Sequence, residues 1–221
     1  MPHITAVERH MKTAAMVGGE VLNGAHRLGQ VYKRRGQYKK SVEWYGRVLV
    51  GRERELGVDH PDTLSTVYGT ALVFGNQGQY DKALEWYGRS LAGMEKALGV
   101  DHPNTLRTVR GMARVFDKQG QYDKALESYW RAFAGTEKAV MSGIDISGHP
   151  PMQYTIGKLV DLYARMGQQE QAQRLRLRMA AMTQGLEVTS IDPEIPKKRA
   201  GCELGRDGCE GSVSSRRRRR E

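Results

Sequence analysis

Apolar residues recur along most of the chain at the spacing of an α-helix. Within residues 62–76, four of them follow one another at intervals of three or four: Leu64, Val67, Ala71 and Phe74. Side chains at this spacing lie on one helical face, so the segment is predicted to be an amphipathic helix. A second helix is predicted over residues 80–98, whose apolar face is formed by Tyr80, Ala83, Leu84, Tyr87 and Leu91. Gly78 separates the two helices, as glycine commonly does just past a helix C-terminus.

This pair of predicted helices is repeated with a period of 42 residues. Residues 36–77 and 78–119 are identical at 27 of 42 positions without a gap, and a third copy begins at Gly120. A further turn, GQQEQA, begins at Gly167, five residues later than a strict period requires. A fixed period of this size is typical of stacked helical hairpins, because each hairpin covers the apolar face that its neighbour leaves exposed. The sequence therefore predicts an all-α array of about four hairpins over residues 21–182.

The connector GVDHP between units carries polar residues with local structural roles. Asp59 and Asp101 are placed to cap the helix that follows, and the prolines after them suit the first helical turn. His60 and His102 occupy equal positions one repeat apart, which is too far for a shared metal ion without further ligands. We therefore expect connector histidines rather than a metal site.

Each unit has the same order of small and aromatic residues around its turn. In the second unit these are Ala71, Phe74, Gly78, Tyr80, Ala83 and Tyr87. This order resembles the tetratricopeptide repeat family. The 42-residue period and the segments GVDHPDTL and GVDHPNTL resemble its kinesin light chain type, and the near-identical copies are similar to the repeat regions of fungal receptor-like proteins. The resemblance covers about residues 21–182 and implies an α-α superhelix, a solenoid whose first helices line a concave groove.

Two departures from the family pattern limit what the resemblance implies about ligands. Family members often carry an asparagine in the first helix that binds a peptide backbone, and Gly69 and Gly111 stand at this place. Some family members hold a C-terminal carboxylate with Lys and Asn side chains; the corresponding places here hold His26, Gln30, Gly69, Arg107 and Gly111. The resemblance therefore implies neither this clamp nor a chaperone-tail ligand.

A basic stripe in the third unit is the strongest candidate for a binding site. Arg107, Arg110, Arg114 and Lys118 follow at spacings of 3, 4 and 4, so they lie on one helical face, away from the apolar stripe. We expect this face to be open and to receive an acidic segment, because guanidinium groups bind carboxylates bidentately. The alternative is a solvated face that serves solubility only.

Two residues of the second unit occupy the places that match the arginines. Tyr68 and Leu72 stand 42 residues before Arg110 and Arg114. A tyrosine beside arginines makes a plausible interaction hot spot. Ordinary variation on an open helix face is the alternative interpretation.

The composition favours recognition over catalysis. The formal net charge is +10, which attracts acidic peptides, nucleic acid or an anionic membrane face. The sequence contains no phosphate-binding loop, no dinucleotide motif and no serine elbow, so neither an enzyme nor a bound cofactor is expected. The two cysteines, Cys202 and Cys209, lack the spacing of a zinc site. Two reduced thiols favour an intracellular, cytoplasmic location.

The ends of the chain differ from the array. Residues 1–20 are predicted to form an N-terminal capping helix without the features of a signal peptide, since Ile4, Val7, Met11 and Ala14 share one face. Residues 183–221 are predicted to be a disordered basic tail. Its final arginine run, residues 216–220, leaves nuclear import and nucleic-acid contact open. No uncharged stretch is apolar enough to predict a membrane span.

These features predict a non-catalytic protein–protein interaction module or adaptor. It would bind a partner segment in the groove or along the outer face of the array. A self-assembling structural subunit of a larger complex and a basic nucleic-acid-associated protein remain the alternatives.

Overall fold

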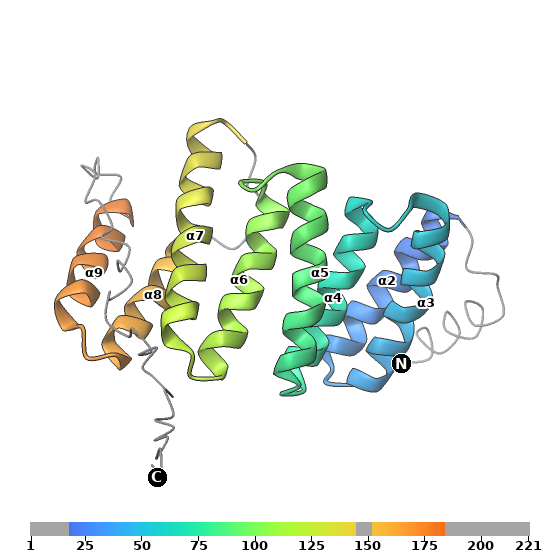
Figure 1. The fold of residues 1–221 in the computed structure, drawn as a ribbon, viewed down its shortest axis with the longest axis horizontal. Coiled ribbons are helices and arrows are strands. Elements are labelled where there is room, and N and C mark those ends of the chain that lie inside the picture. The colour runs from blue at the N-terminus through green and yellow to red at the C-terminus, as the bar shows by residue number, and fades with distance from the viewer. Residues whose placement is uncertain (1–17, 145–151, 184–221) are drawn as a thin grey trace, which may run out of the picture. The chain divides into compact units, whose positions relative to one another are not determined.

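The computed structural model describes residues 18–144 and 152–183, and these form four helical hairpins (Figure 1). Each helix packs mainly against the helices before and after it in the sequence, and the first helices of the first three hairpins also touch one another in succession. The predicted all-α array is confirmed. The hairpins are α2 (Gly19–Arg34) with α3 (Tyr38–Leu56), α4 (Pro61–Asn76) with α5 (Tyr80–Leu98), α6 (Pro103–Lys118) with α7 (Tyr122–Met141), and α8 (Met152–Arg165) with α9 (Gln169–Thr183).

Glycine closes the first helix of every hairpin in the same way. Gly78 has a φ of 75°, in the left-handed region that side chains with a Cβ rarely adopt. The amide of Gln79 then donates to the carbonyl of Phe74 over 3.0 Å, and that of Gly78 to Gly75 over 3.2 Å. This is the Schellman arrangement, which satisfies the last carbonyls of the helix and turns the chain into the second helix.

The expected caps at Asp59 and Asp101 are wrong, because the following histidines cap α4 and α6. The Nδ1 atom of His60 accepts a hydrogen bond from the amide of Asp62 over 3.1 Å, and His102 caps α6 in the same way over 3.2 Å. The two aspartates instead face the outer surface, where they pair with lysines of the next hairpin.

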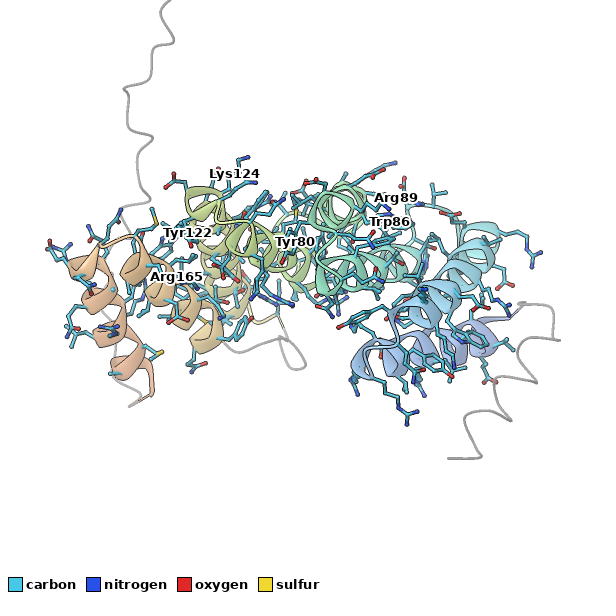
Figure 2. The ribbon with its side chains drawn as sticks, turned by 90° about the horizontal axis from the view of Figure 1, so that it is seen from below. Tyr80, Trp86, Arg89, Tyr122, Lys124 and Arg165 are labelled. Carbon is cyan, nitrogen blue, oxygen red and sulfur yellow. The ribbon has the colours of Figure 1, made fainter. Side chains whose placement is uncertain are left out.

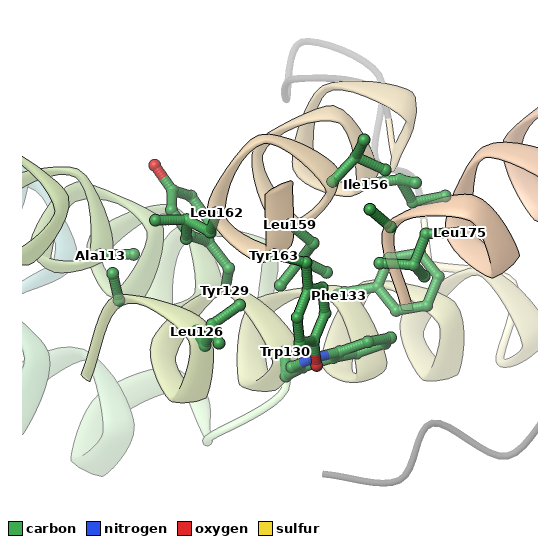
Figure 3. Packing of buried hydrophobic residues seen from close by; sticks show 13 residues of the cluster. Ala113, Leu126, Tyr129, Trp130, Phe133, Ile156, Leu159, Leu162, Tyr163 and Leu175 are labelled. Carbon is green, nitrogen blue, oxygen red and sulfur yellow. The ribbon is translucent and has the colours of Figure 1, made fainter. Parts of the chain in front are cut away.

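Aromatic and aliphatic side chains fill the space between hairpins. The largest cluster joins the last two hairpins and contains Trp130, Phe133, Leu159 and Tyr163 (Figure 3). The indole nitrogen of Trp130 donates to the hydroxyl of Tyr163 over 2.9 Å, so these two buried polar atoms satisfy each other.

On the outer surface, repeated ion pairs connect a second helix to the preceding second helix or to the connector that follows that helix. Lys96 pairs with Asp59 over 2.6 Å and Lys138 with Asp101 over 2.5 Å, one repeat later. A second series joins Arg89 to Glu53, Arg131 to Glu95 and Arg178 to Glu137. Between the last two hairpins, Arg165 pairs with Asp117 over 2.6 Å and its guanidinium lies 5.7 Å from the centre of the Tyr122 ring (Figure 2). The arginine–glutamate pairs thus recur at all three junctions between hairpins, and the lysine–aspartate pairs recur at the first two.

Several predictions lie outside the described residues. They concern the N-terminal capping helix before residue 18, and the tail after residue 183 with Cys202, Cys209 and the final arginine run. Helix α2 begins at Gly19, two residues before the expected start of the array. None of the helices in residues 18–144 and 152–183 combines the length and the apolar character needed to cross a bilayer.

Candidate functional site

Two neighbouring cavities lie along the first helices of the first three hairpins. The first cavity has a volume of about 240 Å³ and the second of about 590 Å³, and Leu72 of α4 lines both. We call them together the first-helix groove. Its residues come mainly from α2, α4 and α6, with tyrosines of α3 and α5 behind them.

The first cavity is built from three successive hairpins. His26, Gln30 and Lys33 follow at spacings of four and three on α2, so they share the helical face that borders it. Helix α3 supplies Tyr45 and Arg52. The remaining lining residues are Asp62, Ser65, Tyr68, Gly69 and Leu72 of α4 and Arg107 of α6.

Four of the five places compared above with a carboxylate clamp therefore line a single cavity. They are His26, Gln30, Gly69 and Arg107, and they offer different chemistry from the Lys and Asn side chains of the clamp.

The predicted basic stripe divides between the two cavities. Arg107 lines the first cavity, whereas Arg114 and Lys118 are exposed and line the second. Arg110 lines neither, because its side chain is only 5% exposed, so the expectation of an open side chain is wrong at this position. Tyr68, Tyr154 and Tyr129, from the helices on either side, are close enough to affect the pKa of Arg110, and burial is the main cause of its lowered value.

Tyr68 lies at the centre of the candidate binding residues. The guanidinium of Arg107 lies over its ring, 4.6 Å from the centroid, and the ring of Tyr87 is 5.7 Å away. Burial raises the pKa of Tyr68, while Arg107, Arg114 and Arg110 act in the opposite direction. Tyr68 is therefore surrounded by the arginines that the sequence placed one repeat later, and it is partly buried rather than freely exposed.

The electrostatic environment of the groove is strongly positive. Burial lowers the pKa of Lys33, and the nearby Arg34, Arg114 and Arg107 lower it further. Burial also lowers the pKa of His26 to about 4, with Arg52 and Lys33 adding to the effect. His26 is therefore neutral near pH 7.

The groove cations differ from those of the outer surface in having no acidic partner. Lys33, Arg107, Arg114 and Lys118 form no ion pair within the described part of the chain, and neither does the buried Arg110 on the same helix as the last three. On the outer surface, by contrast, one arginine or lysine after another pairs with a carboxylate of the neighbouring hairpin. Buried Nε of Arg107 and Nη2 of Arg110 also lack any hydrogen-bond partner in this structure. Unpaired, partly desolvated cations are suited to binding an anion.

Glycines in the first helices allow tyrosines to reach the groove. A Cβ atom on Gly111 would lie 2.6 Å from the ring of Tyr87, and one on Gly69 would lie 2.9 Å from Tyr45. The hydroxyl of Tyr45 is buried without a hydrogen-bond partner, and burial is the largest cause that raises its pKa to about 12. It is therefore a neutral donor at the floor of the first cavity.

Sequence reasoning missed Lys33 and Tyr45 as site residues. The period of 42 aligns Lys33 with Gly75, so comparison of repeats gives no basic signal there. Tyr45 is one of the tyrosines that define the repeat. Comparison of repeats therefore assigns its side chain to the packed core and gives no role to its hydroxyl. The one available signal was that Lys33 is charged and lies on the polar side of α2, whereas the matching position of the next repeat is a glycine.

No three His, Cys, Asp or Glu side chains come together as metal ligands within residues 18–144 and 152–183. The arrangement is one of cations, aromatic rings and hydroxyl donors, which is chemically suited to anions and peptide chains.

Comparison with known proteins agrees with the repeat pattern. The family model of the tetratricopeptide repeat matches residues 20–96 and, in a second overlapping alignment, residues 66–138. Together these cover more than half of the chain. The chain belongs to the tetratricopeptide repeat family. A search of curated protein sequences finds no match.

Solved structures with similar folds narrow the type of tetratricopeptide array. One holds kinesin light chain "nearly identical TPR-like repeats" of Podosopora anserina; it is 26% identical, with a TM-score of 0.63 over 78% of this chain and 79% of that chain. BtubC (BKLC) from P. vanneervenii is 16% identical, with a TM-score of 0.64 over 78% of this chain and 68% of its own, and shows the fold alone. The kinesin light chain-like type of this tetratricopeptide protein is thus confirmed.

Proposed function

We propose that this protein is a non-catalytic adaptor that holds an acidic segment of a partner protein in the first-helix groove. Tetratricopeptide arrays are protein-interaction scaffolds, and the groove of this one carries the charge that such a segment complements. The observation that carries the proposal is the contrast between paired outer cations and unpaired groove cations.

The contrast matters because a buried, unpaired guanidinium costs free energy in the unbound protein. Arg110 is 5% exposed, and no carboxylate is among the groups that affect its pKa. An incoming carboxylate near Arg107 and Arg114 offsets that cost, so a part of the binding energy comes from relief of repulsion between these cations. Leu72 and Tyr68 supply apolar contact between the charged positions, as expected for an acidic segment with some apolar residues.

The test uses charge reversal at two groove positions, the exposed Arg114 and the partly buried Lys33. We expect Arg114→Glu and Lys33→Glu each to weaken binding of a fluorescent Glu/Asp-rich peptide at least ten-fold in an anisotropy titration. Arg176→Glu, at an exposed position on α9 far from both cavities in the sequence, makes the same change of charge and should leave binding unchanged. Equal losses in all three variants would point to a general effect of net charge and refute the groove site.

The same titration separates the alternative functions. A single-stranded oligonucleotide that binds more tightly than the peptide, with a steep dependence on salt, favours the nucleic-acid alternative. A molar mass that rises with protein concentration in light scattering favours the self-assembling subunit. A monomer that binds the peptide and not the oligonucleotide supports the adaptor.

A further inference from the structure

The first cavity carries a charge that its own residues do not neutralise. Lys33, Arg52 and Arg107 contribute three positive charges, and Asp62 contributes one negative charge. His26 adds none near pH 7, because burial and its cationic neighbours lower its pKa to about 4. The cavity therefore presents two net positive charges to whatever enters it.

Three hydrogen-bond donors from three different helices remain free at this cavity. The ammonium group of Lys33 makes no ion pair within the described residues, and the Nε of Arg107 is buried without a partner. The hydroxyl of Tyr45, on a residue with 0% exposure, is likewise unpartnered. Arg52 is not one of these free donors, because its guanidinium already donates hydrogen bonds to the backbone carbonyl of Asp62, to Thr66 and to Asn23. Arg52 therefore supplies positive charge, whereas Lys33, Tyr45 and Arg107 supply free hydrogen-bond donors.

Tyr45 lines the cavity, and its buried hydroxyl lies against Gly69 of α4. A Cβ atom at Gly69 would lie 3.1 Å from the hydroxyl oxygen and 2.9 Å from the ring carbon that carries it. Any larger residue would have to displace the tyrosine. Family members often carry an asparagine donor at the place of Gly69 on α4. Here the nearby donor is the hydroxyl of Tyr45 from α3.

We infer that the first cavity holds the phosphate monoester of a phosphorylated side chain on the partner segment. This inference rests on the proposed function and specifies which acidic group occupies this part of the groove. A phosphate monoester carries about −1.5 to −2 charges at pH 7 and three strong acceptor oxygens. Its charge comes close to balancing the two net positive charges of the cavity, and its three oxygens match the three free donors.

A carboxylate fits the cavity less well than a phosphate. It brings one negative charge and two oxygens, so it would leave one cation unneutralised and one donor unbonded. The buried hydroxyl of Tyr45 would then stay without a partner, which carries a desolvation cost.

The size of the cavity indicates a side-chain group rather than a free small molecule. Its volume of about 240 Å³ is below the range of roughly 300–1,000 Å³ that is usual for small-molecule pockets. The second cavity continues past Leu72, with Arg114 and Lys118 on its walls. A peptide whose phosphate occupies the first cavity can therefore place flanking acidic residues in the second.

The experiment compares nine-residue fluorescent peptide pools that differ only at the central residue. Four pools carry phosphoserine, phosphotyrosine, glutamate or serine between the same degenerate acidic and apolar flanks, and a fifth ends in aspartate with a free carboxylate. Anisotropy is measured at pH 7.5, with inorganic phosphate as a competitor. We expect at least one phosphorylated pool to bind ten-fold or more tightly than the glutamate pool and the carboxylate-ended pool.

Two variants locate the phosphate. Tyr45→Phe removes only a hydroxyl that has no partner in the free protein, so the fold should be unaffected while affinity for the phosphorylated pool falls about ten-fold. Tyr129→Phe is the matched control: it removes an equally buried, unpartnered hydroxyl at the same repeat position but outside both cavities. Lys33→Gln should reduce the preference for phosphate over glutamate to less than three-fold.

Each outcome decides between the two proposals. If the glutamate or carboxylate-ended pool binds as tightly as the phosphorylated pools, the phosphate inference is wrong and the acidic-segment function stands. A phosphate preference that survives both Tyr45→Phe and Lys33→Gln also overturns the inference, because the phosphate then binds elsewhere. If no pool binds, the proposed function fails as well.

Discussion

At the scale of single residues, the spacing between helices depends on one tyrosine per repeat. Tyr45 lies between Gly29 of its own hairpin and Gly69 of the next, and a Cβ atom on either glycine would come within 3 Å of its ring. Tyr87 meets Gly111 in the same way. The glycines that appear unfavourable for a helix therefore allow the close packing that brings tyrosine hydroxyls to the groove.

The close packing predicts opposite effects for two glycines in neighbouring helices. Gly111→Ala should lower the free energy of unfolding by about 1–2 kcal/mol, because overlap with the buried Tyr87 ring outweighs the gain in helix propensity. Gly88→Ala should raise it by about 0.5–1 kcal/mol, since a Cβ atom there meets nothing within 4 Å. Urea unfolding followed by circular dichroism measures both, and a gain in stability for Gly111→Ala would contradict the structure.

The titration of His26 predicts how stability varies with acidity. Its pKa is about 4 in the folded protein, below the ordinary value of 6.5, chiefly through burial and then through Arg52, Lys33 and Arg107, while Asp62 acts in the opposite direction. The unfolded chain therefore binds more protons between these values. Above pH 6.5 the imidazole is neutral in both states and does not reduce stability. As the pH falls from 6.5 toward 4, the free energy of unfolding decreases by up to about 3 kcal/mol.

Urea unfolding at pH 7.5 and pH 4.5 tests the contribution of His26. His26→Gln cannot take up the proton, so the difference in stability between the two pH values should be smaller in the variant than in the parent protein. An equal difference in both proteins would show that other groups cause the acid sensitivity.

The sequence predicted part of the site at this scale, and the part it missed has a physical reason. It identified Arg107, Arg114 and Tyr68 from helical spacing and from comparison of repeats. It could not predict that Arg110 is buried, because helical spacing gives the face on which a residue lies and not how neighbouring helices cover that face. Lys33 was missed because its place in the groove depends on how three hairpins pack.

At the scale of elements, local signals fixed the helices closely. The apolar spacing predicted α5 at residues 80–98 as observed, and α4 to within one residue, because Gly and Pro punctuate both ends. The identity of the cap was predicted wrongly. Both Asp and His precede the proline, and His60 and His102, one residue nearer the helix, have the required extended backbone and a nitrogen acceptor.

Histidine capping predicts a specific effect of substitution at α6. His102→Ala should lower the free energy of unfolding by about 1 kcal/mol, because the amide of Asn104 loses its acceptor. His102→Asn keeps an acceptor at this distance and should lose less than half as much. Urea midpoints of the two variants measure the difference, and equal losses would show that the imidazole ring contributes by packing and not as a cap.

At the scale of the whole array, charged residues divide into two groups with different roles. On the outer surface, pairs such as Lys96 with Asp59 and Lys138 with Asp101 recur from one hairpin to the next and help to fix how hairpins stack. In the groove, Lys33, Arg107, Arg114 and Lys118 form no ion pair with any residue that the structure describes. The first group favours the folded array, whereas the second group lowers stability and is expected to be retained for binding.

This division predicts opposite effects for two largely buried arginines. Arg110→Met should raise the free energy of unfolding by about 1–3 kcal/mol, because it replaces an unpaired buried charge with an apolar side chain of similar length. Arg178→Met should lower it, because it leaves Glu137 unpaired and removes a guanidinium that lies 4.8 Å from the centroid of the Phe133 ring.

In these two variants, affinity for the acidic peptide is expected to change independently of stability. Arg110→Met should weaken it despite the gain in stability, since part of the positive potential around Tyr68 is lost, whereas Arg178→Met should leave it unchanged. Thermal unfolding and anisotropy on the same preparations measure both properties. An Arg110→Met protein that is less stable than the parent would mean that the guanidinium has a partner in solution and that the groove is not an unneutralised site.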